Sequence, residues 1–245
     1  MRANTNKTAD PKPNPVPSDK VYQLKITLRY ISPLVWRRVL VKSETTIAQL
    51  HAIIQTVMGW EYLHLHQFRI HGKTYGIYRN GGISFADDPD EVKLRDFKLR
   101  KGEKFVYEYD MGDFWLHDIR IEAVLAVEPG KKYPLCTEGD GDCPPEDCGG
   151  PNGFQELMAE RFSWSAFCDA REDVLLVAQR LLDFYHGGPP PSYEEDDFME
   201  ALDRMNQCIE DAPIEFHRRE VNAALQKVFK PIKARKERSC TSESK

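Results

Sequence analysis

Residues 21–30 alternate strictly between apolar and polar side chains, which restricts the start of the folded chain to a β-strand with one buried face. The apolar positions are Tyr22, Leu24, Ile26, Leu28 and Tyr30. Pro33 interrupts this pattern, and residues 34–41 predict a second strand that pairs with the first in a hairpin. We expect Arg37 to lie on the polar face of that hairpin.

A second hairpin is predicted from residues 104–110 and 114–125, with Met111-Gly112 at the turn. If Asp110 pairs with Asp113, the apolar side chains share one face of this hairpin. The other face then contains Glu108, Asp110, Asp113, Trp115 and His117. So many ionisable groups are unusual for a plain solvent-exposed face, and we interpret this face as a candidate functional site.

Residues 47–58 carry apolar side chains at helical spacing, and residues 66–70 predict a further strand. Thr46 followed by Gln49 fits a capping box, and Gly59 fits the helix end. These elements indicate an α+β fold, with a mainly antiparallel, β-grasp-like sheet and a helix packed across it. A mixed two-layer sandwich of another topology is the alternative.

The chain divides by composition into four parts. We predict a Pro-rich disordered leader, an α+β domain, a helical C-terminal region with a Gly/Pro linker, and a basic disordered tail. Their bounds are 1–20, 21–170, 171–229 (with the linker at 186–191) and 230–245.

Charge and hydropathy exclude some classes of protein. A net charge of −5 argues against a surface devoted entirely to nucleic acid, although local basic patches are compatible with it. No apolar run reaches the roughly 18 residues that a membrane span needs. Six cysteines without a secretory signal predict reduced thiols in a cytoplasmic protein.

The segment Cys143–Pro151 combines two thiols, two carboxylates, three prolines and two glycines. Such a loop is stiff in places and sharply turned in others, and could present Cys143, Glu146 and Asp147 to a divalent cation. The thiol is not an activated nucleophile, because nearby carboxylates raise its pKa. Alternatively, Glu146 or Asp147 caps a helix that begins near Gly153.

The hairpin supplies further candidate metal ligands. We consider His117 with Glu108 or Asp110, joined by Glu146 and Asp147, as a site for Zn, Mg or Ca. Asp113 and His117 are about 13 Å apart along a strand that rises ~3.3 Å per residue, so they do not share an ion. Alternatively, the aspartates bond to the turn backbone and His117 packs beside Trp115.

His64-Leu65-His66 places two imidazoles on one face of an extended segment, where they could bind zinc with a third ligand. The alternative is that one histidine faces solvent while the other is buried. Trp60 and Trp115 belong to the core or offer a stacking surface. We therefore add Asp113, Trp115, Trp60, His64, His66 and Arg37 as a candidate binding surface.

Four ordered motifs in residues 21–160 resemble the plasmid pRiA4b ORF-3-like family. They are Ile31–Arg38; Met58-Gly59-Trp60 with His64–Phe68; Tyr109–His117; and Cys143–Asp147 with Gly149-Gly150 and Gly153-Phe154. The resemblance implies a compact α+β domain and a setting among plasmids and mobile elements. Some members carry a resolvase label, but this sequence shows no recombinase constellation.

Two functional hypotheses follow. The first is an accessory protein of a mobile element or plasmid that binds protein or nucleic acid through the polar face of its sheet. The second is a metal-dependent hydrolase, acting on phosphodiesters, with a His/carboxylate site between the 104–125 hairpin and the 136–150 loop. The sequence does not decide between them.

Overall fold

The computed structural model describes residues 20–76, 85–191 and 196–230. Residues 1–19 and 231–245, which contain nearly all of the predicted leader and basic tail, lie outside the described residues.

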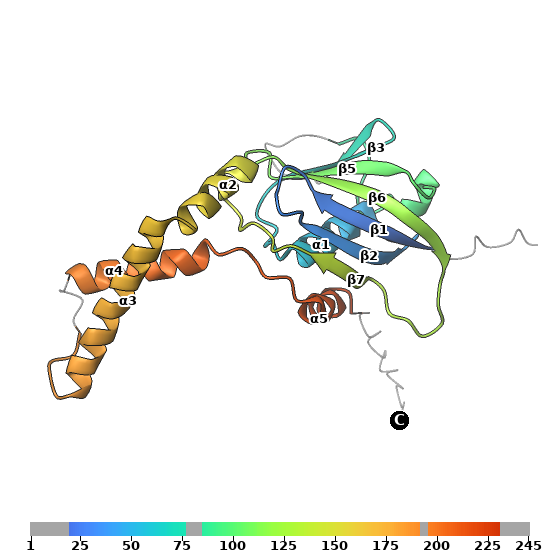
Figure 1. The fold of residues 1–245 in the computed structure, drawn as a ribbon. Coiled ribbons are helices and arrows are strands. Elements are labelled where there is room, and N and C mark those ends of the chain that lie inside the picture. The colour runs from blue at the N-terminus through green and yellow to red at the C-terminus, as the bar shows by residue number, and fades with distance from the viewer. Residues whose placement is uncertain (1–19, 77–84, 192–195, 231–245) are drawn as a thin grey trace, which may run out of the picture.

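The centre of the protein is a seven-stranded sheet in which every pair of neighbouring strands is antiparallel (Figure 1). The strand order is β4-β3-β5-β6-β1-β2-β7. The strands are β1 (Lys20–Leu28), β2 (Trp36–Lys42), β3 (His66–Ile70), β4 (Lys73–Gly76), β5 (Lys104–Tyr109), β6 (Trp115–Ala126) and β7 (Leu135–Asp140). This arrangement confirms the α+β class and the mainly antiparallel sheet.

Helix α1 (Ile47–Met58) packs across one face of the sheet and begins and ends where the sequence predicts. Thr46 and Gln49 form both bonds of the capping box, each 3.1 Å long. Gly59 ends the helix with a φ of 89°, a conformation that glycine adopts without steric cost. The helix's apolar stripe is buried against the sheet, and a 3-10 turn, η1 (Leu94–Phe97), follows later in the chain.

The predicted register of the second hairpin is wrong. Tyr109 pairs with Trp115 and Tyr107 pairs with His117, so Asp113 remains in a longer turn. Because side chains alternate along a strand, Trp115 and His117 point into the core, whereas Glu108 lies on the outer face. Burial of the large indole selects this register, because the predicted register would leave it in solvent.

Arg37 also lies on the opposite face from the one predicted. It pairs with Ile26, whose side chain points into the core, and it is only 1% exposed. Its guanidinium donates to the carbonyl oxygens of Val57 (2.9 Å), Trp36 (3.0 Å), Asp140 (2.9 Å) and Gly141 (2.9 Å). The last two bonds reach β7 and the residue after it. Strand β7 was not predicted from the sequence, because acids and glycines alternate over Glu138–Asp142 in place of the apolar pattern of a strand.

The C-terminal helices separate into two groups. Helices α2 (Gly150–Arg161) and α3 (Trp164–Tyr185) extend away from the sheet as an arm, and α4 (Asp196–Glu210) packs against α3 (Figure 1). Helix α5 (Arg218–Val228) returns to the sheet, where Asn222 bonds to both backbone groups of Cys136 at 2.8 Å. None of the described helices has the length and apolar character of a membrane span.

We expect Arg37→Met to lower the free energy of unfolding by about 3 kcal/mol, because it leaves buried carbonyl oxygens without their donor. The control is Arg38→Met, since Arg38 lies on the outer face and forms partly exposed ion pairs with Glu122 and Glu138. That change should cost less than about 1 kcal/mol. Urea unfolding of both variants measures the difference. Equal losses would show that the buried guanidinium has no special structural role.

Candidate metal centre

Three connecting segments meet at one end of the sheet. They are residues 59–65 between α1 and β3, residues 110–114 between β5 and β6, and residues 141–149 between β7 and α2. The first two lie together because β3 pairs with β5, and the Asp110 amide donates to the Leu65 carbonyl at 2.9 Å. The third joins them through the Trp60 indole, which donates to the Pro144 carbonyl at 2.9 Å.

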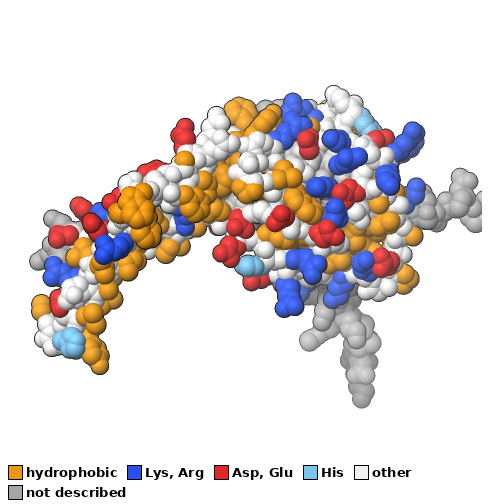
Figure 2. Space-filling view, in the orientation of Figure 1, with side chains coloured by type: hydrophobic (Ala, Val, Ile, Leu, Met, Phe, Trp, Pro, Cys, Tyr) orange, Lys and Arg blue, Asp and Glu red, His pale blue; other side chains and the backbone are white. Residues whose placement is uncertain are grey.

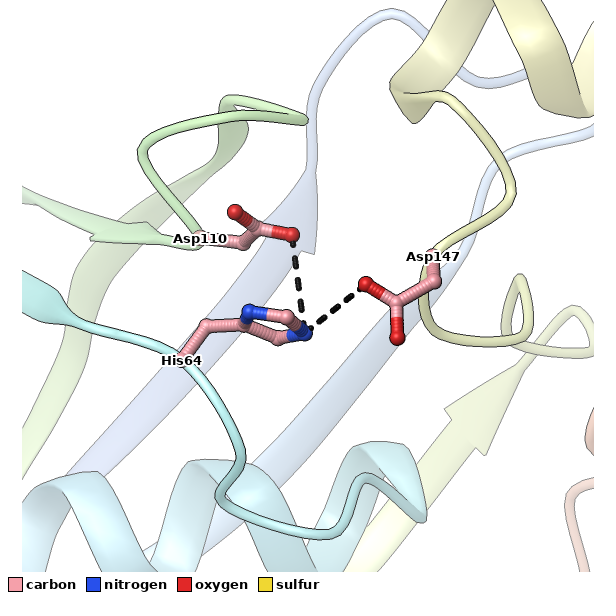
Figure 3. Close-up of side chains that lie close together, drawn as sticks. All are labelled: His64, Asp110 and Asp147. Atoms are coloured by element: carbon pink, nitrogen blue, oxygen red, sulfur yellow. Dashed lines mark ion pairs between the residues drawn. The ribbon is translucent and has the colours of Figure 1, made fainter.

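Each of these segments contributes one potential metal ligand. The Nε2 atom of His64 lies 3.0 Å from Oδ1 of Asp147 and 3.8 Å from Oδ2 of Asp110 (Figure 3). The three ligand atoms all lie within 4.8 Å of one another. We call His64, Asp110 and Asp147 the His-Asp-Asp cluster.

Local backbone geometry positions both carboxylates. Asp110 and Asp147 have φ values of 55° and 59°, in the left-handed region that aspartate tolerates better than most residues. The Gly112 amide donates to Oδ1 of Asp110 at 2.9 Å, and this bond fixes the carboxylate so that Oδ2 faces His64. Asp110 therefore has both predicted roles. One oxygen bonds to the turn backbone, and the other faces His64 in the cluster.

A hydrogen-bond network centred on Tyr109 supports the cluster. The Tyr109 hydroxyl donates to Glu146 and accepts from the amides of Leu63 (3.0 Å) and His64 (3.3 Å). Glu146 also accepts from the Glu61 amide at 2.6 Å. Burial and the bond to Glu146 raise the pKa of Tyr109 well above its ordinary value, so the hydroxyl stays protonated and remains a donor. The network thereby joins residues 59–65 and 141–149 to the end of β5, directly before Asp110.

The cluster is open to solvent on one side. The Asp110 side chain is 11% exposed and that of His64 27%, but that of Asp147 is 64% exposed. Two apolar side chains in the same segments, Leu63 and Phe114, are more than half exposed. A cation bound here would contact Asp110 on its buried side, and solvent or substrate would reach it from the exposed side, next to Asp147.

The structure does not bring His117 and Glu108 together. His117 is fully buried, and its Nδ1 lies 3.1 Å from the Trp115 carbonyl oxygen. Glu108 is on the other face, where it accepts from Gln67 at 2.8 Å and from Arg69 at 3.1 Å. The two residues therefore cannot share an ion, and the prediction that both lie on one face of the hairpin is wrong.

The other predicted site residues mostly lie in the interior. Cys143 is fully buried, and burial raises the pKa of its thiol far above the ordinary value. Trp60 stacks on Tyr109, and His66 stacks on His51 with ring centroids 3.5 Å apart. Trp115 and Arg37 are also buried, so the predicted binding surface retains only His64 and Asp113 as accessible members.

Neither Glu146 nor Asp147 caps the helix that follows. Gly149 is the N-cap of α2 and no side chain bonds to the first turn. Instead, Asp113 accepts from the Gly149 amide at 3.1 Å and ties the hairpin turn to this loop. The capping prediction is wrong because the helix begins at Gly150, three residues earlier than expected, which leaves Asp147 free to turn toward His64.

The sequence predicted every member of the His-Asp-Asp cluster as a site residue and grouped Asp110 with Asp147 as metal ligands, but it did not group His64 with them. It assigned His64 to a separate pair with His66 and placed His117 with the carboxylates. The sequence feature that indicates the position of His64 is the short connection between Gly59, which ends α1, and His66, which begins β3. His64 lies two residues before β3. Because β3 pairs with β5, this position is at the end of the sheet, beside the hairpin turn that contains Asp110.

Burial lowers the pKa of His117 to about 3, from an ordinary value near 6.5. Below pH 6.5 the unfolded chain binds a proton there that the folded protein does not, so stability should fall as pH falls. From pH 6.5 to 5 the loss attributable to His117 is about 2 kcal/mol. Urea unfolding at both pH values should show a loss smaller by this amount in His117→Gln. Identical pH dependence in both proteins would contradict this prediction.

The comparisons with known proteins cover the region that contains the cluster. The model of the plasmid pRiA4b ORF-3-like protein family matches residues 20–163. "Uncharacterized protein y4hQ" of Sinorhizobium fredii (strain NBRC 101917 / NGR234) is 37% identical over 154 residues, or 62% of this chain and 74% of that protein. The crystal structure of MM3350 from Methanosarcina mazei Go1, a protein of unknown function, is 33% identical, with a TM-score of 0.54, and the match covers 62% of this chain and 87% of that one. The chain therefore belongs to the plasmid pRiA4b ORF-3-like family.

Proposed function

We propose that this protein is a metal-dependent hydrolase in which His64, Asp110 and Asp147 bind a divalent cation. The observation that carries the proposal is the convergence of three ligand atoms within 4.8 Å from three separate segments. Because these residues are distant in sequence, their meeting depends on the whole fold. In this proposal the site lies between the 104–125 hairpin and the 136–150 loop, and His64 takes the role that the second hypothesis gave to His117.

The spacing and chemistry of the ligands favour zinc. A tetrahedral ion with bonds of about 2.0–2.2 Å separates its ligands by about 3.4 Å. The two distances from His64, 3.0 and 3.8 Å, lie on either side of that value, so small side-chain rotations suffice. An imidazole ligand favours Zn²⁺ over Mg²⁺ and Ca²⁺, which prefer oxygen atoms alone.

Three protein ligands leave at least one coordination position for water. A bound zinc ion lowers the pKa of such a water to about 7 and can polarise a phosphoryl oxygen. The exposed side of Asp147 gives an extended substrate access to that position. Leu63 and Phe114, which are exposed in the neighbouring segments, would contact the substrate's apolar parts. We propose phosphodiesters as the substrate class, because a zinc ion with an open position can polarise a phosphoryl oxygen.

The polar face of the sheet bears on the nucleic-acid-binding hypothesis. Three of its arginines pair with carboxylates of the same face, in Arg29–Asp118 (2.5 Å), Arg38–Glu122 (2.5 Å) and Arg69–Glu108 (3.1 Å). Figure 2 shows basic and acidic side chains interspersed over this part of the molecule. Lys25, Arg120 and Lys104 are cross-strand neighbours on this face and form no ion pair with the described residues, so they remain available to phosphates and keep nucleic-acid binding as a second candidate function. The mobile-element setting and the cytoplasmic location stay predictions.

Metal binding is the first test. We expect the chelator-treated protein to bind one Zn²⁺ per chain in isothermal titration calorimetry, and to bind Mg²⁺ and Ca²⁺ more weakly. His64→Ala and Asp110→Asn should weaken zinc binding by about 100-fold or more, because each removes a direct ligand. His71→Ala is the control, since His71 is an exposed histidine outside the cluster. Unchanged affinity in His64→Ala would refute the metal centre.

Hydrolysis is the second test, with bis(4-nitrophenyl) phosphate as the probe. The zinc-loaded protein should release 4-nitrophenolate at a rate that rises with pH through about 7, as the bound water ionises. Asp147→Asn should lower this rate by about 100-fold or more. The control is Asp113→Asn, in which the amide oxygen can still accept the Gly149 bond.

The two tests separate binding from catalysis. Zinc binding without hydrolysis of any phosphodiester probe would overturn the hydrolase proposal and leave the cluster as a structural metal site that joins three segments. Hydrolysis that survives in both His64→Ala and Asp147→Asn would show that another group or a contaminant is responsible.

A further inference from the structure

Helix α3 carries apolar side chains on two sides. One side packs against α4, in which Phe198 and Ala201 are buried. On that side Asp173 is buried and pairs with Arg204 at 2.6 Å. Figure 1 shows that this arm projects from the sheet, so the sheet does not cover the other side of α3.

The second side of α3 is an exposed apolar stripe. Its members are Trp164 (77% exposed), Phe167 (59%), Val174 (51%), Leu181 (52%) and Tyr185 (82%). With Arg171 and Ala178 they follow steps of three and four residues along the whole helix. This is the heptad spacing with which one helix packs against another along its length. In Figure 2, hydrophobic side chains follow the arm.

The stripe is large enough to drive association. A fully buried aromatic side chain contributes 150–250 Å², so the exposed parts of Trp164, Phe167 and Tyr185 together amount to about 400 Å². A stable interface takes about 800 Å² from each partner. Three side chains therefore supply about half of that area, before the aliphatic members and the flanking Leu175 and Leu182 are added.

We propose that this stripe is a self-association surface, on which α3 of a second copy packs antiparallel about a two-fold axis. The midpoint of α3 lies between Val174 and Leu175. An axis through that midpoint places Trp164 opposite Tyr185 of the second copy, and Phe167 opposite Leu182. It also places the long Arg171 opposite the small Ala178. The remaining stripe members also oppose apolar side chains, since Val174 lies opposite Leu175 and Leu181 opposite Cys168. This is the self-complementarity that an isologous dimer requires.

The position of the stripe agrees with this assignment. The family match ends at residue 163, and the stripe begins at Trp164, so the interface belongs to an extension of the family domain. The metal centre lies at the end of the sheet and contributes no residue to the stripe. The inference is thus independent of the proposed function, and either can fail alone.

The test is the mass of the full-length protein by size-exclusion chromatography with light scattering, from about 1 to 100 μM. We expect the wild-type mass to approach twice the chain mass of 28.3 kDa. Val174→Glu and Leu181→Glu, which put a charge into the stripe, should weaken association by at least about 100-fold. The matched control is Val228→Glu on α5, because Val228 is 52% exposed and Val174 51%. Circular dichroism confirms that each variant retains its helices.

A wild-type protein that remains at the chain mass over the whole range would overturn the proposal, and would leave a different protein as the partner of the stripe. A dimer that persists in both Val174→Glu and Leu181→Glu would also overturn it, because association would then use another surface. Loss of the dimer in Val228→Glu alone would assign the interface to α5.

Discussion

The buried guanidinium of Arg37 holds together the parts of the fold that build the His-Asp-Asp cluster. It binds the Val57 carbonyl near the end of α1, just before the segment that carries His64. It also binds the carbonyls of Asp140 and Gly141, where β7 leads into the loop that carries Asp147. Phe216, which precedes α5, covers the guanidinium at 4.2 Å. Burying a charge is costly, and these carbonyl oxygens and the aromatic face compensate for the water it loses.

The His-Asp-Asp cluster rests on an aromatic layer that makes its geometry rigid. Trp60 stacks on Tyr109, and Trp60 also packs beside Trp115 with ring centroids 5.8 Å apart. The Tyr109 hydroxyl connects this layer to Glu146, the residue next to Asp147. Preorganised ligands bind a cation with little loss of conformational entropy, so this network would favour the proposed binding of metal. The buried residues that were candidates for direct chemistry, such as Trp115 and His117, thus act as its support.

The protein combines two surfaces with different physical requirements. The His-Asp-Asp cluster depends on strands and loops within residues 20–163, which match the family. The apolar stripe lies on a helix that projects from them, where a second molecule can approach without covering the cluster. If both proposals hold, the dimer presents two independent metal centres, each on its own sheet. Helix α5, which follows the arm in the chain, contacts β7 and α1 and so fixes the C-terminal side of the arm to the same domain.

Local patterns in the sequence determined much of the fold. The Thr46–Gln49 capping box, the apolar stripe of residues 47–58 and the terminal Gly59 predict α1 with its observed bounds, because each signal acts within a few residues. The alternation in residues 21–30 predicts β1 for the same reason.

Tertiary structure decided the hairpin register, the position of Arg37 and the grouping of the cluster, because each depends on contacts between residues distant in the sequence. The turn at residues 110–114 allowed more than one register, and burial of Trp115 selected the one that also buries His117. The polar side chain of Arg37 suggested an outward position, but carbonyls from α1 and β7 satisfy it inside. The cluster of His64, Asp110 and Asp147 forms only when three loops meet, and no spacing in the chain encodes that meeting.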